Sequence, residues 1–365
     1  MRRVVALFLL LSLSVAAWPC LWDNDTLAAE ARGLPTVLDA IVGRIPVNPP
    51  EYYKRRIEIS EAAIKADSSK LEHYDNLAVA HDKLGNFEKA MKAMIEKQAA
   101  MAQMKLLNDE HMYRYHANIG TIFAHEWVRQ QPNGEPAMLE LAIAEIAKAI
   151  EINPDAHFGR EKVQLRLLET LAQVSGVRPE GDYKELSSWQ EFARQMGPKE
   201  CAEAVIAIMS FGGSPENRDL LAVLNATIPS LDGHLLYMAE LREKELKAAG
   251  KKMWIEDNSI HGYVIRYKNR AKDQYKELRE DAKLYQATYS KFVLDQIALG
   301  RHPDTHADFW KTYVERPRLR IAEPSWVQQF LETRSVEILV GSILSAPILI
   351  WAAFRIRKRL KAKAA

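Results

Sequence analysis

Two histidines in the C-terminal third have the spacing of a metal site. His302 and His306 are four residues apart, with Asp304 and Asp308 beside them. On a helix, residues four apart share one face, where imidazole and carboxylate groups could bind zinc or copper. The alternative is an ordinary helix start after Pro303, in which Asp304 is a favourable first-turn charge. His302 and His306 are therefore candidates for a metal site, although we expect no cofactor.

A second set of polar residues has types suited to holding a peptide. Asn76, Asn118 and Lys162 recur at nearly regular intervals along the chain. Amide donors and an ammonium group could together bind a carboxylate, such as the C-terminus of a peptide. The alternative is a row of solvated polar side chains. Which of these applies depends on whether the elements that carry the three residues place them on one surface.

Sequence motifs of catalysis are missing. The chain has no glycine-rich phosphate loop followed by lysine, no nucleophile elbow, no His-Glu-x-x-His and no Cys-x-x-Cys. This favours a binding protein over an enzyme. A metalloenzyme that uses the histidines remains an alternative.

The body of the chain is predicted to be all-α. Between residues 55 and 300, apolar residues recur at spacings of three and four, and alternating strand patterns are scarce. Proline and glycine fall mostly between these segments rather than within them. Helices must therefore position the candidate residues.

The stretch HDKLGNFEKA, residues 81–90, separates two amphipathic segments by a Gly-Asn turn. If Leu71 is position 1 of a repeat of about 34 residues, small and aromatic residues fall where two helices would touch. The residues that define this pattern are Tyr74, Leu77, Ala78, Gly85, Phe87 and Ala90. In these positions the chain resembles the tetratricopeptide repeat family.

A second copy of the pattern has a longer turn. Gly120 lies in its first helix, Ala142 in its second, and Pro154 follows. Another first helix is predicted around FGREKVQLRLLETL, so the resemblance covers residues 60–175 well and 176–250 poorly. It implies a short right-handed solenoid over residues 60–250 whose first helices line a concave groove.

The resemblance also assigns a role to the polar row. Asn76, Asn118 and Lys162 fall at the same position of successive first helices, so they are expected to face the groove. They resemble part of the carboxylate clamp of chaperone-binding repeats. Asp75 and Val79, however, stand where that clamp has lysine and asparagine. A polar groove without a clamp is the alternative.

Residues 255–300 are predicted to form one long amphipathic helix. Val264, Ala271, Leu278, Tyr285 and Phe292 recur every seven residues as an apolar seam. The seam could pack on the repeats or pair with a second copy of the chain. A structural homo-oligomer is therefore an alternative function, and a homodimer is considered.

Both ends of the chain indicate a membrane. Residues 1–17 have two arginines before a short apolar run, which is typical of a signal peptide. Residues 336–354 are predicted to form a transmembrane helix, and the basic tail 355–365 should remain in the cytoplasm. The bulk of the chain is then extracytoplasmic, and periplasmic if the source is bacterial. Residues 18–59 are expected to cover the first repeat, and residues 301–334 to precede the membrane.

The charge balance argues against nucleic acid as a partner. The chain has 50 Lys and Arg, and the two end segments hold eight of them, which leaves 42 basic against 48 acidic residues in the body. A nucleic-acid-binding surface needs an excess of basic residues. Cys20 and Cys201 could form a disulfide or remain thiols. We therefore expect a membrane-anchored scaffold that binds a protein or peptide partner.

Overall fold

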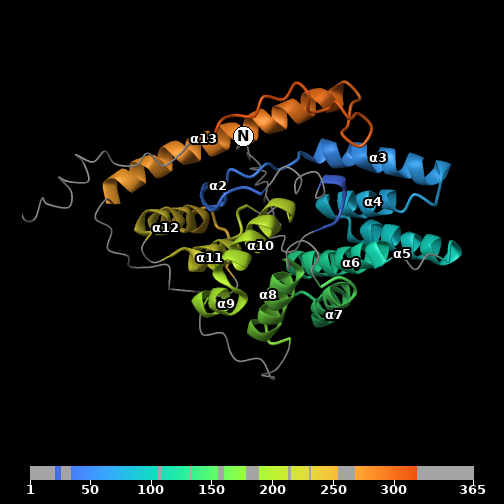
Figure 1. Cartoon of the computed structure of the whole chain (residues 1–365), viewed down its shortest axis with the longest axis horizontal. Helices are drawn as coiled ribbons and strands as arrows, with labels where there is room; N and C mark the ends of the chain where they lie inside the picture. The colour runs from blue at the N-terminus through green and yellow to red at the C-terminus, as the bar shows by residue number, and fades with distance from the viewer. Residues whose placement is uncertain are drawn as a thin grey trace, which may run out of the picture. The chain divides into compact units, whose positions relative to one another are not determined.

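The computed structural model describes residues 21–25, 34–105, 109–131, 133–154, 160–177, 189–212, 215–229, 232–253 and 268–318. In these residues every regular element is a helix, which confirms the predicted all-α fold (Figure 1). Contacts divide the chain after Pro317, and the described helices all belong to the first unit.

The first helices form antiparallel neighbours with short connections. Helix α3 spans Pro50–Ala66, α4 spans Glu72–Lys83 and α5 spans Phe87–Gln103. Helix α3 starts with proline at its first turn, where the missing N–H costs nothing. Between α4 and α5, Gly85 has φ of 75°, a left-handed conformation that glycine adopts without steric cost. The Gly-Asn turn therefore ends one helix and reverses the chain into the next.

The next helices repeat this arrangement with a longer turn. Helix α6 spans Asp109–Arg129, α7 spans Pro136–Ile152 and α8 spans Arg160–Val174. Helices α6 and α7 approach closely at Gly120, where a Cβ atom would lie 2.8 Å from Ile146 and 2.9 Å from the carbonyl oxygen of Ala142. A larger residue at position 120 would therefore push the two helices apart.

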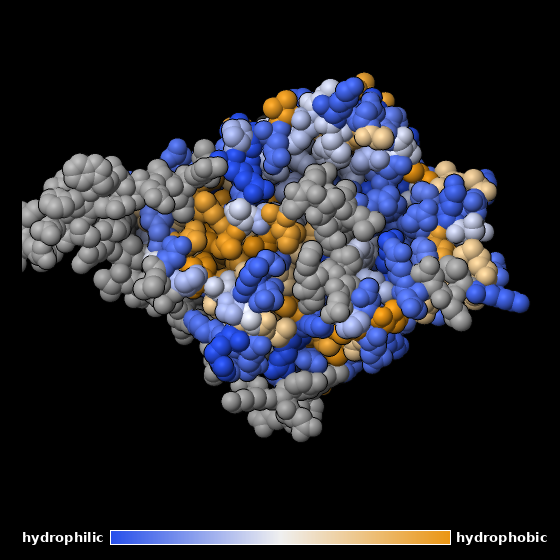
Figure 2. All heavy atoms as spheres, viewed as in Figure 1, coloured by the Kyte–Doolittle hydropathy of each residue, from blue (hydrophilic) through white to orange (hydrophobic). Residues whose placement is uncertain are grey.

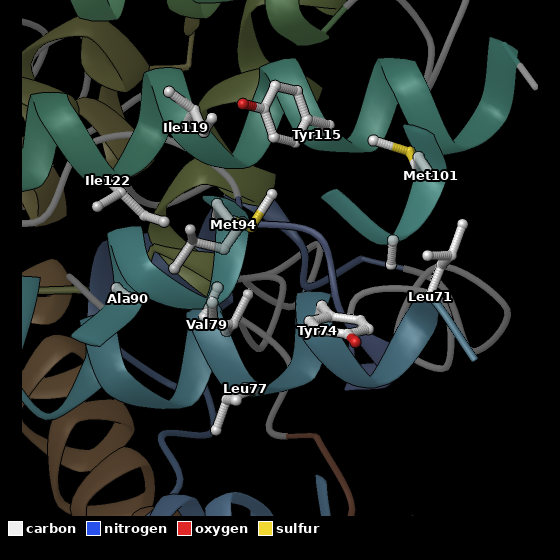
Figure 3. Packing of buried hydrophobic residues seen from close by; sticks show 14 residues of the cluster. Leu71, Tyr74, Leu77, Val79, Ala90, Met94, Met101, Tyr115, Ile119 and Ile122 are labelled. Atoms are coloured by element: carbon white, nitrogen blue, oxygen red, sulfur yellow. The ribbon is translucent and has the colours of Figure 1, made fainter. Parts of the chain in front are cut away.

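A shared apolar core joins α4, α5 and α6. The side chains of Leu71, Tyr74, Met94, Met101 and Ile119 point into a common interior (Figure 3). Ala78 and Ala90 are fully buried in the same core. Phe87 is partly buried and its ring lies 5.8 Å from that of Phe123. Small residues at the contacts and large residues around them let the helices pack at short range.

The described residues between 189 and 253 form the next helices. They are α9 (Trp189–Met196), α10 (Pro198–Phe211), α11 (Arg218–Thr227) and α12 (Gly233–Ala248). The Asn217 side chain caps α11 by accepting from Leu220 N, and Asp232 caps α12 by accepting from Leu235 N. Cys201 of α10 is a buried thiol whose pKa burial raises to about 12. Polar residues cover most of the face seen in Figure 2, and hydrophobic residues gather in one area between them.

Helix α13 spans Lys268–Ala298 and lies along α12, α3 and the short helix α2, Val37–Val42 (Figure 1). The predicted long helix began at residue 255, and its first part lies outside the described residues. Ala271, Leu278 and Tyr285 of the predicted seam are buried. The seam thus packs within the chain.

Residues 301–318 return along the end of α13 without forming a helix. Trp310 stacks on Tyr289 and Phe292 of α13, with ring centroids 5.7 and 5.6 Å apart. Phe309 is buried beneath them. These aromatic contacts hold the segment that carries His302, Asp304 and His306 against the helices.

None of the helices among the described residues is long and apolar enough to span a membrane. The predicted signal peptide 1–17, Cys20, the predicted transmembrane helix 336–354 and the tail 355–365 lie outside the described residues.

Candidate functional site

The candidate site is built around residues 21–25, Leu-Trp-Asp-Asn-Asp, which we call the arm. Leu21 joins the core formed by α4, α5 and α6. Trp22 is 2% exposed and meets Tyr113 of α6 edge to face, with ring centroids 5.8 Å apart. The guanidinium groups of Arg114 and Arg160 lie over its indole at 5.8 and 5.5 Å. The arm therefore inserts an aromatic anchor between α6 and α8.

Asn118 of α6 binds both main-chain polar groups of Trp22. Its Oδ1 accepts from Trp22 N at 2.6 Å, and its Nδ2 donates to Trp22 O at 3.1 Å. An amide side chain that pairs in this way reproduces the pattern by which a neighbouring β-strand satisfies an extended segment. We call this arrangement an amide clamp.

A buried ion pair fixes the orientation of Asn118. Asp75 of α4 accepts from Asn118 Nδ2 at 3.0 Å and from Lys97 Nζ at 2.7 Å. Asp75 and Lys97 are almost completely buried. Because an ionised carboxylate only accepts, it keeps Nδ2 on its own side and leaves Oδ1 for Trp22 N. The Asn118 amide is thus preorganised to bind the N–H and C=O of Trp22.

Asn76 makes a weaker version of this contact. Its Oδ1 accepts from Asn24 N at 3.1 Å, and the side chain is fully buried. Its Nδ2 has no hydrogen-bond partner. A buried donor without a partner costs about 1–3 kcal/mol. The arm therefore satisfies Asn118 completely and Asn76 only in part.

The structure brings together only two of the three residues predicted to share one face. Asn76 and Asn118 meet at the arm, whereas Lys162 is exposed on α8. The buried polar residues of that part of α8 are its neighbours Arg160, Glu161 and Gln164. Gln164 Nε2 donates to Thr121 of α6 at 3.3 Å.

Arg56 of α3 anchors the acidic end of the arm. This fully buried guanidinium binds Asp23 at 2.7 Å and Asp25 at 2.9 Å. It also donates from Nε and Nη2 to the two carboxylate oxygens of Asp304, at 2.8 and 2.9 Å. Tyr52 OH accepts from Arg56 at 2.9 Å and donates to Asp25 at 2.5 Å. We call this set the Arg56 cluster: Tyr52, Arg56, Asp23, Asp25 and Asp304.

The Arg56 cluster has more negative charge than positive. Burial alone would lower the pKa of Arg56, but the carboxylates of Asp25, Asp23 and Asp304 outweigh burial and raise it well above its ordinary value. Arg56 therefore stays charged. For Asp304 the effects have opposite signs. Burial raises the pKa of its carboxyl, but the charge of Arg56 outweighs burial and leaves that pKa below its ordinary value. Three carboxylates around one cation leave the site acidic.

The sequence alone did not suggest this cluster. Arg56 and Asp304 are 248 residues apart, and Arg56 and Asp23 are 33 apart, with no motif that joins them. The one available signal was the arm itself, in which apolar and acidic residues adjoin without helical spacing.

The two candidate metal-binding histidines have other partners in the structure. His302 is fully buried, and its ring lies 4.4 Å from that of Tyr52. Its Nδ1 accepts from Asp304 N at 3.2 Å, and burial lowers its pKa to about 4. His306 Nδ1 accepts from His302 N at 3.4 Å. Residues 302–306 lie in turns, so the helical face that a metal site would need is not formed, and among the described residues no group of metal-binding side chains comes together.

Another polar cluster contains an acid–imidazole pair. Asp82 of α4 binds His125 Nδ1 and an Arg129 nitrogen of α6, each at 2.6 Å. Burial raises the pKa of Asp82, but His125 and Arg129 outweigh it and lower that pKa to about 2. Asp82 and His125 are buried, so a substrate has no access to them in this structure.

Comparison with known proteins adds no further assignment, because the chain matches no family model, no curated protein and no solved structure.

Proposed function

We propose that this chain is a helical-repeat scaffold that binds a short segment of a protein or peptide partner at the site that the arm occupies. The observation that carries the proposal is the amide clamp, in which Asn118 binds the N–H and C=O of Trp22 and Asn76 binds the N–H of Asn24. Side chains that hold main-chain groups can bind a peptide through its backbone, while neighbouring side-chain contacts set the preference for sequence.

The repeat assignment forms part of this proposal. It is supported by the turn at Gly85, the close approach at Gly120 and the buried contact alanines Ala78, Ala90 and Ala142. Repeat stacking makes a concave surface without catalytic groups.

The membrane location is also a proposal. A charge-free apolar run at 338–354, followed directly by a basic tail, is typical of a C-terminal anchor with its tail in the cytoplasm. The arginines before the apolar run of residues 4–17 agree with export of the body. The partner would then be met outside the cytoplasm.

The alternatives draw less support from the described residues. A homo-oligomer built on the long helix would need the seam residues Ala271, Leu278 and Tyr285, which are buried within the chain. A metal-binding function would need further ligands beside His302 and His306, and no group of three metal-binding side chains comes together among the described residues.

The test is capture of partners from membrane extracts by three full-length proteins. They are the wild type, the double variant Asp23→Asn/Asp25→Asn, and the same variant with Asn118→Ala. The double variant weakens the arm but keeps the two-point contact between Arg56 and Asp304. We expect capture to rise several-fold in the double variant and to be lost in the triple variant. Equal capture by all three proteins would overturn the proposal.

A further inference from the structure

The side chains of the arm are held by α3, α4, α6 and α8, and they describe the ligand that this site accepts. Resting on the function above, we propose that the partner is a short segment of aromatic–acidic chemistry. It carries an aromatic residue followed by carboxylates one and three positions later, and it replaces the arm.

The aromatic position is selected by the surroundings of Trp22. The indole is enclosed by Tyr113 and by the guanidinium groups of Arg114 and Arg160. Cations attract the face of an aromatic ring but not an aliphatic side chain of similar size. An aromatic residue therefore fits this position better than leucine or valine.

The two acidic positions are selected by Arg56. Its guanidinium is fully buried and binds the first carboxylate, Asp23, and the second, Asp25. Tyr52 and Asn48 add donors to Asp25, at 2.5 and 3.2 Å. A partner with amides at both positions would leave buried donors without charged acceptors, which discriminates strongly against it.

The arm is an occupant that can be exchanged, and Asn76 supplies the evidence. Its Nδ2 is fully buried and has no partner while the arm is bound. Arg56 donates to more acceptors than a guanidinium has N–H hydrogens, so some of those hydrogens are shared. A segment whose carbonyl reaches Asn76 Nδ2 would make a contact that the arm lacks.

The fit also requires that release of the arm leaves a stable site. Asp304 lies on a different segment and contacts Arg56 through both carboxylate oxygens. When the arm leaves, Arg56 therefore keeps one carboxylate and is not left as a buried unpaired charge. The groove can be vacated and refilled.

The experiment uses the full-length protein in detergent and two fluorescent peptides. The first has the sequence of residues 21–27, Leu-Trp-Asp-Asn-Asp-Thr-Leu, and the control has asparagine in place of both aspartates. The Asp23→Asn/Asp25→Asn protein should bind the acidic peptide at least about tenfold more tightly than the wild type, because its own arm competes less. The same protein should prefer the acidic peptide over the control peptide by a similar factor.

As a control for folding, circular dichroism and thermal melting of the double variant are compared with those of the wild type. Asp25→Asn alone is the second variant, since that side chain is one third exposed and tolerates the change more easily. Absence of binding, or equal affinity for the two peptides in a folded variant, overturns the inference. If the peptides fail while the double variant still captures a partner from extracts, only the ligand chemistry is wrong. Failure of both experiments removes the proposed function as well.

Discussion

Two segments of the chain are each held by a side-chain amide that binds the N–H and the C=O of one residue. The arm is clamped at Trp22 by Asn118 of α6. The segment after α2, residues 43–48, which we call the strap, is clamped at Val47 by Gln286 of α13. Gln286 accepts from Val47 N at 3.0 Å and donates to Val47 O at 2.8 Å. In both places a side-chain amide takes the place of a main-chain partner for the N–H and the C=O of one residue.

The surroundings of the two clamps differ. In the strap, Gln286 also contacts Ser290, Tyr289 donates to Asn48, and Arg44 lies 4.1 Å from the centre of the Tyr285 ring. In the arm, a buried Asn76 donor lacks a partner and carboxylates outnumber the cation. The same local geometry can therefore serve a permanent contact and an exchangeable one, depending on the balance of donors and charges around it.

The largest effect should come from Arg56→Met. Removing the guanidinium leaves three carboxylates together without a cation, which should cost roughly 3–5 kcal/mol of stability and release the arm. Urea unfolding measures the loss, and hydrogen exchange of residues 21–25 measures the release. The matched control in the strap is Arg44→Met, which should cost less because Asp281 keeps Arg316 at 2.9 Å. Equal losses, or an arm that stays protected, would contradict the comparison.

Protonation of His302 in acid should weaken the contacts that hold the arm at the Arg56 cluster. Burial lowers the pKa of His302 to about 4, from an ordinary 6.5. Between pH 6.5 and 4 the unfolded chain binds a proton that the folded chain does not. Lowering the pH from 6.5 to 4 should therefore reduce the free energy of unfolding by about 3 kcal/mol, and this dependence should be absent above pH 6.5. Denaturant unfolding across this range measures the slope.

The control for the acid effect is His302→Asn, which keeps an acceptor near Nδ1 but cannot ionise. This variant should lose the extra slope, and hydrogen exchange at acid pH should rise in the arm before the strap. An unchanged slope in the variant would assign the acid sensitivity to other groups.

The two clamp amides should differ by a smaller amount. Asn118→Ala leaves Trp22 N buried without an acceptor and removes a donor from Asp75, so we expect a loss of about 2 kcal/mol. Gln286→Ala should cost about 1 kcal/mol, because Gln286 is only partly buried and water can replace it. Thermal melting of the two variants provides the comparison. A larger loss for Gln286→Ala would reverse our ranking of the clamps.

The smallest effect is expected for Asn76→Ala. The change removes one hydrogen bond to Asn24 N and also removes a buried donor that has no partner, so the two effects should cancel to within about 0.5 kcal/mol. Chemical denaturation measures the difference. A loss well above 1 kcal/mol would mean that the arm fits Asn76 as completely as it fits Asn118.

Part of this architecture could be predicted from residue spacing. The helical period, the glycine turn at Gly85 and the apolar seam of α13 depend on neighbours along the chain, so the sequence contains the signal. The shared position of Asn76 and Asn118 was visible for the same reason. Their placement at one surface required only that successive helices lie side by side.

The rest depends on contacts between distant segments. The arm has no period, because most of its contacts are made with side chains of α3, α4 and α6. The prediction for residues 18–59 therefore extended only to covering the first repeat. Lys162 matched the pattern but is exposed, since the buried side of α8 carries its neighbours Arg160 and Glu161.

The contact between Arg56 and Asp304 also has a consequence for how the chain reaches its final form. Contacts between residues far apart in sequence require a large loss of chain entropy and tend to form late. During synthesis, residues 302–304 leave the ribosome long after the residues of the first helices. The groove should therefore be assembled before its occupant is secured, and docking of the arm would mark the last stage of maturation.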